Sequence, residues 1–520
     1  MEDHNILITT SGIGSRLGCL TEHTNKSLVR VGDKPSISHI LDFYGKQNRF
    51  IITVGHHGDK VIQFLGLAYQ DWNFEFVEVD KYEGKGSSLG YSISLCRRLL
   101  DSPFIFHACD TIIKKSILPG VQENWLLGCR KSDASSYRTL LTDGNLIVKV
   151  REKGELESNP YCYSGVAGIR DHDLFFKNLA DLLSEGEEVS DADVVNMMMR
   201  EVEFRLEKIE EDEWFDMGNA TSLEFARKNQ KKSHEVLDKN DESIFFSGNM
   251  VIKFFSDKKI NENRVKRAKI LSGFVPKILS SSSNFYSYEK EQGTTFSESA
   301  NPESFKNLLV WSKENFWKSI EADDEFRKVC RGFYVDKTIQ RINRHLEGRK
   351  DEDIILNGVL VPNVYDLIET LDLDWISDGI PARFHGDFIL DNIIKKDDGS
   401  FVFIDWRQDF NGLLEYGDVY YDLAKLNHNL YVSHEIVNKG LYFLEDVSSK
   451  EKKIDIMCSA RLACCKKILT KFVTENKMDL KKIEVLTALV WLNMSGIHQD
   501  KFGKFLFNWG KYNLFLNLNL

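Results

Sequence analysis

Short apolar runs alternate with amphipathic segments over the first 225 residues of the chain. The runs rich in β-branched and aromatic residues cover residues 5–10, 50–56, 74–80 and 103–110, and the amphipathic segments cover 36–47, 60–69 and 88–100. Such alternation predicts βαβ units, and therefore a mainly parallel sheet covered by helices. Ligands of these sheets bind beyond the carboxyl ends of the strands, so polar residues there are candidates for function.

A strongly charged segment, residues 227–243, separates this region from the rest of the chain. After it, residues 243–255 form two runs rich in Phe, Ile and Val around Ser-Gly-Asn, which is typical of a β-hairpin. Helical periodicity dominates from there to the C-terminus. We therefore expect one domain at 1–230 and a second at 231–520. The second would have a small lobe at about 235–295 and a helical lobe at about 296–520.

Composition narrows the class of protein. The 520 residues suit two large domains or three smaller ones. The net charge of -11 does not indicate a protein that binds a nucleic-acid backbone. Nine scattered cysteines without Cys-x-x-Cys spacing fit reduced thiols in a cytoplasmic protein. The N-terminus lacks the features of a signal peptide, and no apolar run approaches the length of about 18 residues that predicts a membrane span.

Candidate phosphate-binding residues follow the first predicted strand. They are Gly12, Gly14, Ser15 and Arg16, with Lys26 further along. Glycines let backbone N–H groups approach a phosphate, and the two cations can neutralise its charge. A Gly-x-Gly after a strand also forms ordinary tight turns, so this segment alone leaves both interpretations open.

Two carboxylates suggest a metal site. Asp110 ends an apolar run, where a carboxylate without a partner would be costly, and Asp216 lies in a similar context. Two carboxylates from separate elements can hold Mg²⁺ against a triphosphate. Each acid taken alone is better explained as a cap or a surface residue, so the prediction depends on the pair.

The order of motifs in this half resembles the nucleoside-triphosphate transferases that activate sugar 1-phosphates, whose fold the phosphocholine cytidylyltransferases share. The motifs are Gly-x-Gly-Ser-Arg at 12–16, Lys26-Ser27-Leu28, Lys34-Pro35, Ala-Cys-Asp at 108–110, Arg-Glu-Lys-Gly at 151–154 and Trp-Phe-Asp-Met-Gly-Asn at 214–219. The resemblance covers roughly residues 4–228 and implies a Rossmann-like nucleotidyltransferase fold. Thr9-Thr10-Ser11 stands where the family usually has Ala-Ala-Gly.

The resemblance implies a role for each matching residue. The triphosphate would be cradled by Gly12, Gly14, Ser15 and Arg16, and Lys26 would bridge its phosphates. Mg²⁺ would be bound by Asp110 and Asp216. The acceptor would lie beside Glu152 and Lys153, with Lys153 on its phosphate, and the loop on the base and sugar side would consist of Gly86, Ser87 and Ser88. Arg16, Lys26 and Lys153 would be catalytic. An acceptor phosphate is already ionised at neutral pH, so no protein nucleophile is required.

A second constellation lies in the C-terminal half. Asp387 and Asn392 are five residues apart, as are the Asp and Asn of the protein-kinase catalytic loop, and Asp405 follows a strand-like run at 401–404. A turn and a strand end would produce the same short motifs by chance. Three such residues in the expected order favour the kinase interpretation.

Residues 383–406 resemble the aminoglycoside phosphotransferase and choline kinase group, a branch of the kinase fold, and the segment from Gly417 fits its downstream Asp-Leu-Ala element. This implies that Asp387 orients the substrate hydroxyl and accepts its proton, and that Asn392 and Asp405 hold Mg²⁺ on ATP. Lys253 would grip the ATP phosphates, with Glu262 as a doubtful partner, and His385 would support the loop. The usual glycine-rich cover over ATP is missing.

Together the two halves predict a bifunctional cytoplasmic enzyme. One half would phosphorylate a small hydroxylated metabolite with ATP, and the other would join the product to a nucleotide from CTP, UTP, GTP or dTTP. A sugar or polyol acceptor is favoured, for surface polysaccharide or glycolipid synthesis, with choline or ethanolamine as the closest alternative. A different alternative is that one half is a non-catalytic nucleotide sensor. The sequence leaves a homo-oligomer open.

Overall fold

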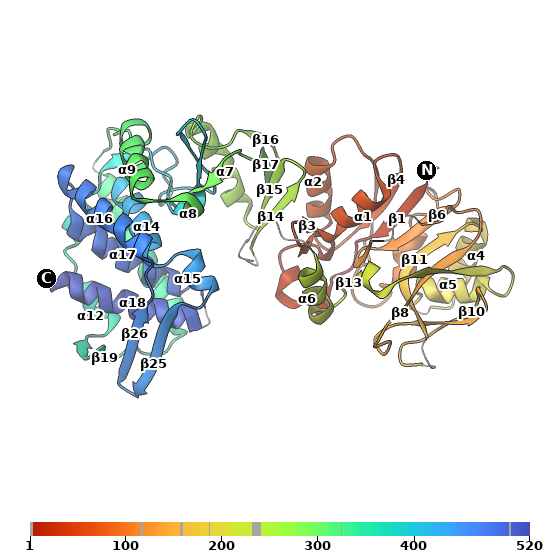
Figure 1. The fold of residues 1–520 in the computed structure, drawn as a ribbon. Coiled ribbons are helices and arrows are strands. Elements are labelled where there is room, and N and C mark those ends of the chain that lie inside the picture. Colours follow the sequence, from red (N-terminus) through yellow and green to blue (C-terminus); the bar gives the residue numbers. More distant parts are fainter. Residues whose placement is uncertain are drawn as a thin grey trace. The chain divides into compact units, whose positions relative to one another are not determined.

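The computed structural model describes residues 4–114, 118–155, 160–186, 188–230, 241–323, 325–498 and 501–519. Contacts divide the chain into two compact units (Figure 1). The first comprises Met1–Asn261 and Leu279–Tyr288, and the second comprises Glu262–Ile278 and Glu289–Leu520. Residues 231–240, at the middle of the charged segment, lie outside the described residues. The domain boundary at residue 230 stays a prediction.

The first unit contains a nine-stranded sheet in the order β5-β4-β1-β6-β11-β8-β12-β10-β9. Its strands are β1 (Asn5–Thr9), β4 (Arg49–Val54), β5 (Asn73–Glu78), β6 (Phe104–Ala108), β8 (Trp125–Arg130), β9 (Thr139–Asp143), β10 (Leu146–Arg151), β11 (Tyr161–Ile169) and β12 (Phe204–Ile209). The predicted strands β1, β4, β5 and β6 are parallel, whereas β11 runs antiparallel to both β6 and β8. The sheet is therefore mixed, and the expectation of a mainly parallel sheet holds only for its first half.

Helices cover both faces of this sheet. They are α1 (Ser36–Tyr44), α2 (Gly58–Ala68), α3 (Leu89–Ser94), α4 (His172–Ser184) and α5 (Asp191–Met198), whereas α6 (Ala220–Asn229) packs in a separate small core with Leu17, Val31 and Phe215. Ile6 and Ile8 of β1 belong to the core that contains α1 and α2, and Leu7 belongs to the core that contains α4 and α5. Because successive strand residues point to opposite faces, a strand buried on both faces is apolar throughout, which is the pattern seen in the sequence.

A smaller sheet in the order β14-β15-β17-β16 belongs mainly to the first unit. Its strands are β14 (Glu242–Ser247), β15 (Met250–Phe255), β16 (Ile278–Ser281) and β17 (Phe285–Glu289), and the first two form the predicted hairpin. The ring of Phe64 on α2 contacts Phe245 at a centroid distance of 5.3 Å, and Gln63 Oε1 accepts from the backbone N–H of Asn284 at 2.9 Å. This sheet therefore shares a core with the N-terminal sheet.

The second unit is mainly helical. Its helices are α8 (Phe296–Ser299), α9 (Pro302–Trp311), α10 (Glu325–Arg331), α11 (Lys337–Leu346), α12 (Val364–Glu369), α13 (Leu373–Ser377), α14 (Val419–Tyr431), α15 (His434–Asn438), α16 (Ala460–Glu475), α17 (Leu480–Ser495) and α18 (Lys501–Leu518), while α7 (Lys258–Ile270) spans the division between the units. Its small sheets are β18-β22-β23, β20-β19-β26-β25 and β21-β24.

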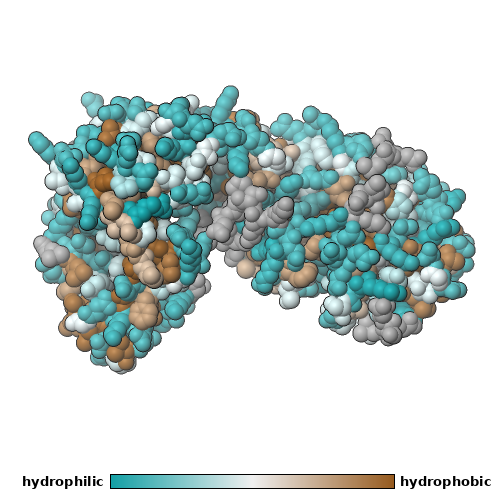
Figure 2. Space-filling view, viewed as in Figure 1, coloured by the Kyte–Doolittle hydropathy of each residue, from teal (hydrophilic) through white to brown (hydrophobic). Residues whose placement is uncertain are grey.

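The strands of these small sheets are β18 (Thr294–Thr295), β19 (Ile354–Leu356), β20 (Val359–Val361), β21 (Pro381–Ala382), β22 (Ile393–Lys395), β23 (Phe401–Phe403), β24 (Gly417–Asp418), β25 (Tyr442–Ser448) and β26 (Glu451–Ile456). Several apolar side chains on or beside β20 and β25 are exposed, including Leu360 and Phe443. Figure 2 shows hydrophobic atoms gathered around this end of the second unit. Among the described residues, no helix has the length and apolar content needed to span a membrane.

Candidate active sites

The loop after β1 places Lys26 at the carboxyl end of the sheet. Asn25 caps the short helical turn Lys26–Leu28, and its side-chain amide donates to the backbone oxygen of Thr10 at 2.8 Å. Gly14 has φ of 70°, and a Cβ there would lie 2.9 Å from Lys26 Cβ. A residue with a side chain would therefore suffer both backbone strain and a clash, so glycine at position 14 lets the two segments meet.

Asp110 and Asp216 are brought together by a short ladder. Asp110 follows β6, and the strand β7 (Thr111–Ile113) after it pairs antiparallel with β13 (Trp214–Asp216), with Asp216 opposite Thr111. The backbone N–H of Met217 donates to the Asp110 backbone oxygen at 2.8 Å. Two carboxylates that are 106 positions apart in the sequence therefore lie close together.

Gly218 marks the point where the charged groups converge. A methyl group added there would lie 3.2 Å from Asp216 Oδ1, 3.5 Å from Asp110 Oδ2 and 3.5 Å from Arg16 Nη2. Lys26 Nζ lies 3.1 Å from Asp110 Oδ2. The structure thus gathers two carboxylates and two cations from four separate segments of the first unit.

The electrostatics of this cluster suit a divalent cation. Burial raises the pKa of Asp216, and the charge of Asp110 raises it further. Burial opposes ionisation of Asp110 as well, but Lys26 outweighs it and holds the pKa of Asp110 below its ordinary value. Two neighbouring carboxylates repel each other when both are ionised, and carboxylate oxygens are preferred ligands of Mg²⁺, so the donor set fits the predicted metal.

Five other predicted residues of this half lie on the loop after β10 and on the loop before α3. Glu152 and Lys153 are exposed beyond β10, and Glu152 forms an ion pair with Arg138 at 3.2 Å. Gly86 has φ of 88° in an exposed loop, and Ser87 donates to the Gly84 backbone oxygen. Ser88 accepts from the Tyr91 backbone N–H at 3.0 Å and so caps α3, which is a structural role.

Sequence reasoning missed three residues of this region. The Tyr137 hydroxyl donates to Asp216 Oδ2 at 3.4 Å, and Arg138 joins Glu152 to Ser190, whose Oγ accepts at 2.8 Å. Gly218 is the third. Tyr137 and Arg138 precede β9 without any motif that would single them out. Gly218 lies two residues after Asp216 in the motif at 214–219, and a small residue so close to a candidate ligand could have pointed to it.

We expect Gly218→Ala to reduce nucleotidyl transfer by about tenfold to a hundredfold, because a methyl group would crowd the space between the carboxylates and Arg16. The measurement is pyrophosphate release at saturating nucleotide. Gly66→Ala on α2 is the control, since nothing lies within 4 Å of a Cβ placed there. Equal activity of the two variants would contradict a site at Gly218.

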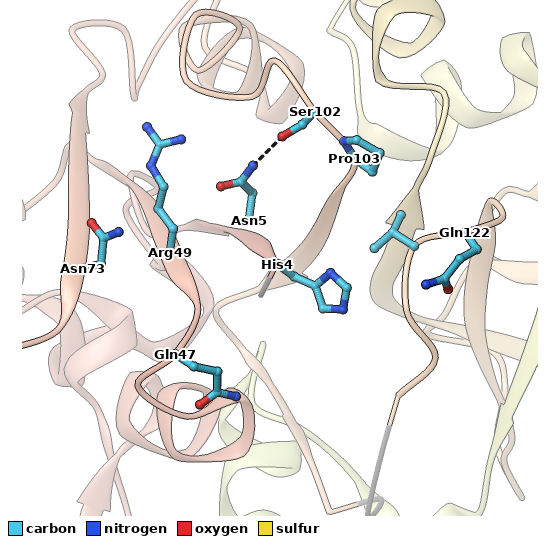
Figure 3. Close-up of a pocket in the computed structure, with 9 residues that line it drawn as sticks. His4, Asn5, Gln47, Arg49, Asn73, Ser102, Pro103 and Gln122 are labelled. Atoms are coloured by element: carbon cyan, nitrogen blue, oxygen red, sulfur yellow. Dashed lines mark hydrogen bonds between the residues drawn. The ribbon is translucent and has the colours of Figure 1, made fainter. Parts of the chain in front are cut away.

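A cavity of the first unit lies elsewhere. Its volume is about 410 Å³, and it is lined by His4, Asn5, Gln47, Arg49, Asn73, Ser102, Pro103, Val121 and Gln122 (Figure 3). Asn5 begins β1 and donates to Ser102 Oγ at 2.8 Å, so the cavity lies at the amino ends of the strands. The charged cluster lies at the opposite edge, which is where parallel sheets bind ligands.

In the second unit, Asp422 of α14 organises the predicted catalytic loop. Its two carboxylate oxygens accept from the backbone N–H groups of His385 at 2.8 Å and Gly386 at 2.7 Å, and from Trp317 Nε1 at 3.0 Å. Burial raises the pKa of Asp422 to about 6 although these bonds lower it. Asp422 belongs to the Asp-Leu-Ala element that the sequence singled out, although no role was predicted for it.

His385 is structural in this arrangement. Burial lowers its pKa to about 4, so the ring is neutral at physiological pH. Its Nε2 lies 3.0 Å from the Ile404 backbone oxygen, and its Nδ1 accepts from the Asp387 backbone N–H at 3.2 Å. The ring therefore links the loop at Asp387 to the chain just before Asp405, in agreement with the expected supporting role.

Asp387 and Asn392 are in direct contact. Asn392 Nδ2 donates to Asp387 Oδ2 at 3.1 Å, and Lys425 Nζ forms an ion pair with Asp387 Oδ1 at 2.7 Å. Burial alone would raise the pKa of Asp387, but Lys425 outweighs burial and lowers it to about 2. Asp387 is therefore ionised throughout the neutral range, and Lys425 is a site residue that sequence reasoning missed.

The hairpin of β22 and β23 brings Asp405 to the same place. The Ile404 backbone N–H donates to the Asn392 backbone oxygen at 2.9 Å, which places Asp405 beside Asn392. Asp405 has φ of 58°, an uncommon conformation for a residue other than glycine, and Arg264 Nη1 lies 2.5 Å from its Oδ1. A strained residue held by its surroundings is typical of a functional site, and a carboxylate with an amide oxygen fits Mg²⁺.

The predicted phosphate lysine, Lys253, belongs to the first unit. Lys253 is buried on β15, and Glu262 forms an ion pair with Lys266. The roles expected for Lys253 and Glu262 therefore stay predictions.

No protein-family model matches the chain. Among curated relatives, the bifunctional protein GlmU of Methanococcus vannielii is 23% identical over 150 residues, which are 28% of this chain and 34% of that protein. Choline-phosphate cytidylyltransferase of Streptococcus pneumoniae is 31% identical over 110 residues, 21% of this chain and 45% of that protein. The chain thus spans about a third to just under half of the length of these relatives.

Solved structures match over a larger part of the chain. CTP:phosphocholine cytidylyltransferase from Streptococcus pneumoniae has 19% identity and a TM-score of 0.39, covering 43% of this chain and 98% of that one. The inositol-1-phosphate CTP transferase from T. maritima has 17% identity and a TM-score of 0.36, covering 44% and 96%. The sequence relatives support a nucleotidyltransferase-like N-terminal part. The kinase-like nature of the C-terminal part stays a prediction.

Proposed function

We propose that the N-terminal half transfers a nucleotidyl group from an NTP to a phosphorylated acceptor. The observation that carries this proposal is the convergence of Asp110, Asp216 and Arg16 around Gly218, with Lys26 on Asp110. The acceptor phosphate oxygen forms a bond to the α-phosphorus of the NTP. The bond between the α-phosphorus and the α,β-bridging oxygen breaks, and pyrophosphate leaves. Asp110 and Asp216 would hold Mg²⁺, which when bound neutralises charge on the triphosphate.

The cations of this half would act on the same charge. Arg16 and Lys26 lie beside the two carboxylates and would stabilise the negative charge that develops on the leaving pyrophosphate. Lys153 would hold the acceptor phosphate, with Glu152 fixed by Arg138 at the rim. Gly12, Gly14 and Ser15 would offer backbone N–H groups to the triphosphate. Gly86, Ser87 and Ser88 would line the base and sugar side.

We propose that the C-terminal half makes the phosphorylated acceptor from ATP. The acceptor hydroxyl oxygen bonds to the γ-phosphorus, the bond to the β,γ-bridging oxygen breaks, ADP leaves, and the proton passes to Asp387. With a pKa of about 2, Asp387 is a weak base, so its main task is to orient the hydroxyl, and the proton transfers late. Asn392 and Asp405 would hold Mg²⁺ on ATP, and Lys253 would bind its phosphates.

The two reactions in sequence would give a nucleotide-activated building block, in the cytoplasm, for surface polysaccharide or glycolipid synthesis. A sugar or polyol is the favoured acceptor, and choline or ethanolamine is the closest alternative. The relative that acts on choline phosphate supports keeping that alternative. The sensor alternative is less well supported, because both sets of carboxylates are intact and assembled.

We expect the protein to consume ATP and one further NTP with a member of a panel of sugars, polyols, hydroxy acids and amino alcohols. Mass spectrometry should detect a phosphorylated acceptor and then its nucleotidyl derivative, with Mg²⁺ required for both. The panel, run with CTP, UTP, GTP and dTTP, identifies acceptor and base together. Absence of both products across the panel would favour the sensor alternative.

A further inference from the structure

Three cationic side chains lie around the Asp387 loop in the second unit. Lys425 of α14 forms the ion pair with Asp387 already described. Arg407 lies on the other side of the loop, because its backbone N–H donates to the His385 backbone oxygen at 3.0 Å and its Cβ would be 2.5 Å from a Cβ at Gly386. The third is Lys337, the first residue of α11.

One aromatic ring ties two of these cations together. Lys337 Nζ lies 4.6 Å from the centroid of the Phe333 ring, and the Arg407 guanidinium carbon lies 5.0 Å from the same centroid. Phe333 is buried. Cations stacked on one buried ring are held in place by cation–π attraction. The arrangement therefore holds two basic groups near the loop that carries Asp387.

Asp409 offsets this charge only in part, since the pKa of Lys337 stays below its ordinary value although Asp409 raises it. Among the described residues, no carboxylate lies within ion-pair distance of Lys337 or Arg407, and Arg407 Nε donates to the backbone oxygen of Asp409 at 3.1 Å. Burial lowers the pKa of Lys337 to about 7, with further lowering by Arg407 and Arg341. A cationic group loses stability in such a place and regains it when an anion binds.

The cavity that Lys337 lines is too small to hold an acceptor. A cavity of about 30 Å³ beside Lys337 is lined by Phe333, Tyr334, Thr338, Tyr421, Leu486, Leu489, Val490 and Asn493. It has room for only a few water molecules, so a metabolite cannot lie there. Lys337 and Arg407 are half-buried, and each lies within electrostatic range of Lys425, the ion-pair partner of Asp387, whose side chain is 35% exposed.

We propose that the acceptor phosphorylated at Asp387 carries an anionic group, a carboxylate or phosphate, which Lys337 and Arg407 bind while its hydroxyl faces Asp387. This inference rests on the proposed kinase function. It narrows the class of acceptor to sugars and polyols that carry an acidic group. Choline and ethanolamine are disfavoured, because Lys337 and Arg407 would repel their positive charge.

The test compares matched acceptors of equal size, such as glycerate with glycerol and gluconate with glucose, and includes choline. Turnover is followed as ADP release by the full-length protein, and binding is measured by calorimetry with the Asp387→Asn variant in the presence of ADP and Mg²⁺. We expect anionic members to be preferred. Lys337→Met should raise their KM about 10- to 100-fold, while the KM for ATP and the turnover of neutral members change little.

Arg344→Met is the matched control, since Arg344 is an exposed cation on the same helix. Preference for neutral or cationic members, or a Lys337→Met effect confined to the KM for ATP, would overturn the inference while the kinase function stands. Anion binding that depends on Lys337, without ADP release from the wild-type protein, would support the inference and reject the kinase function. No binding of any anionic member would overturn the inference.

Discussion

Asp387→Asn is expected to reduce ATP-dependent phosphorylation of the acceptor by a factor of about 10² to 10⁴, the range typical for loss of a group that takes up a proton. Asparagine keeps the size of the side chain and can still contact Asn392, but it cannot take the proton from the hydroxyl. Nucleotidyl transfer should continue within about twofold when the phosphorylated acceptor is supplied, because the first unit retains its own charged cluster. The two activities are measured as ADP release and pyrophosphate release.

The control for this variant is Asp397→Asn, an exposed aspartate in the turn after β22. Asp387→Asn also leaves Lys425 without its carboxylate, so a thermal unfolding curve must accompany the kinetics. Loss of both activities without a change in unfolding temperature would contradict two separate sites. Retention of phosphorylation would mean that Asp387 neither orients the hydroxyl nor takes its proton.

The arrangement of the first four parallel strands was predictable because each carries its own local signal. Residues 6–8 and 50–52 are apolar at every position, as the middle of a strand buried on both faces must be, and the segments at 36–47 and 60–69 have helical spacing. The antiparallel strand β11 between β6 and β8 was not predictable in this way. Strand direction depends on which distant segment supplies the partner, and an apolar run does not encode that.

Candidate site residues were predictable where a motif fixes their order. Asp387, Asn392 and Asp405 are close in sequence, and a short hairpin is enough to bring them together. Lys425, Arg407 and Lys337 were not recognised, because a lysine or an arginine on a helix or in a loop usually faces solvent. Their common surroundings arise only when α11 and α14 pack around Phe333.

Asp216→Asn and Asp110→Asn are both expected to reduce nucleotidyl transfer by about 10²-fold or more, since each removes a ligand of the proposed metal site. The phosphorylated acceptor should then accumulate, while ADP release continues. The variants should differ in stability. Asp110→Asn leaves Lys26 without its ion-pair partner, so the free energy of unfolding should fall by about 1–3 kcal/mol. Mass spectrometry and thermal unfolding measure the two effects.

Asp216→Asn should leave the free energy of unfolding unchanged or raise it, because burial and the charge of Asp110 already disfavour its ionised form. If a neutral substitution leaves the protein at least as stable but inactive, the original residue serves function at a cost in protein stability. Asp101→Asn, in the exposed loop before β6, is the control for a lost carboxylate. If Asp216→Asn unfolded as easily as Asp110→Asn and kept its activity, Asp216 would be a structural residue, and the metal would require other ligands.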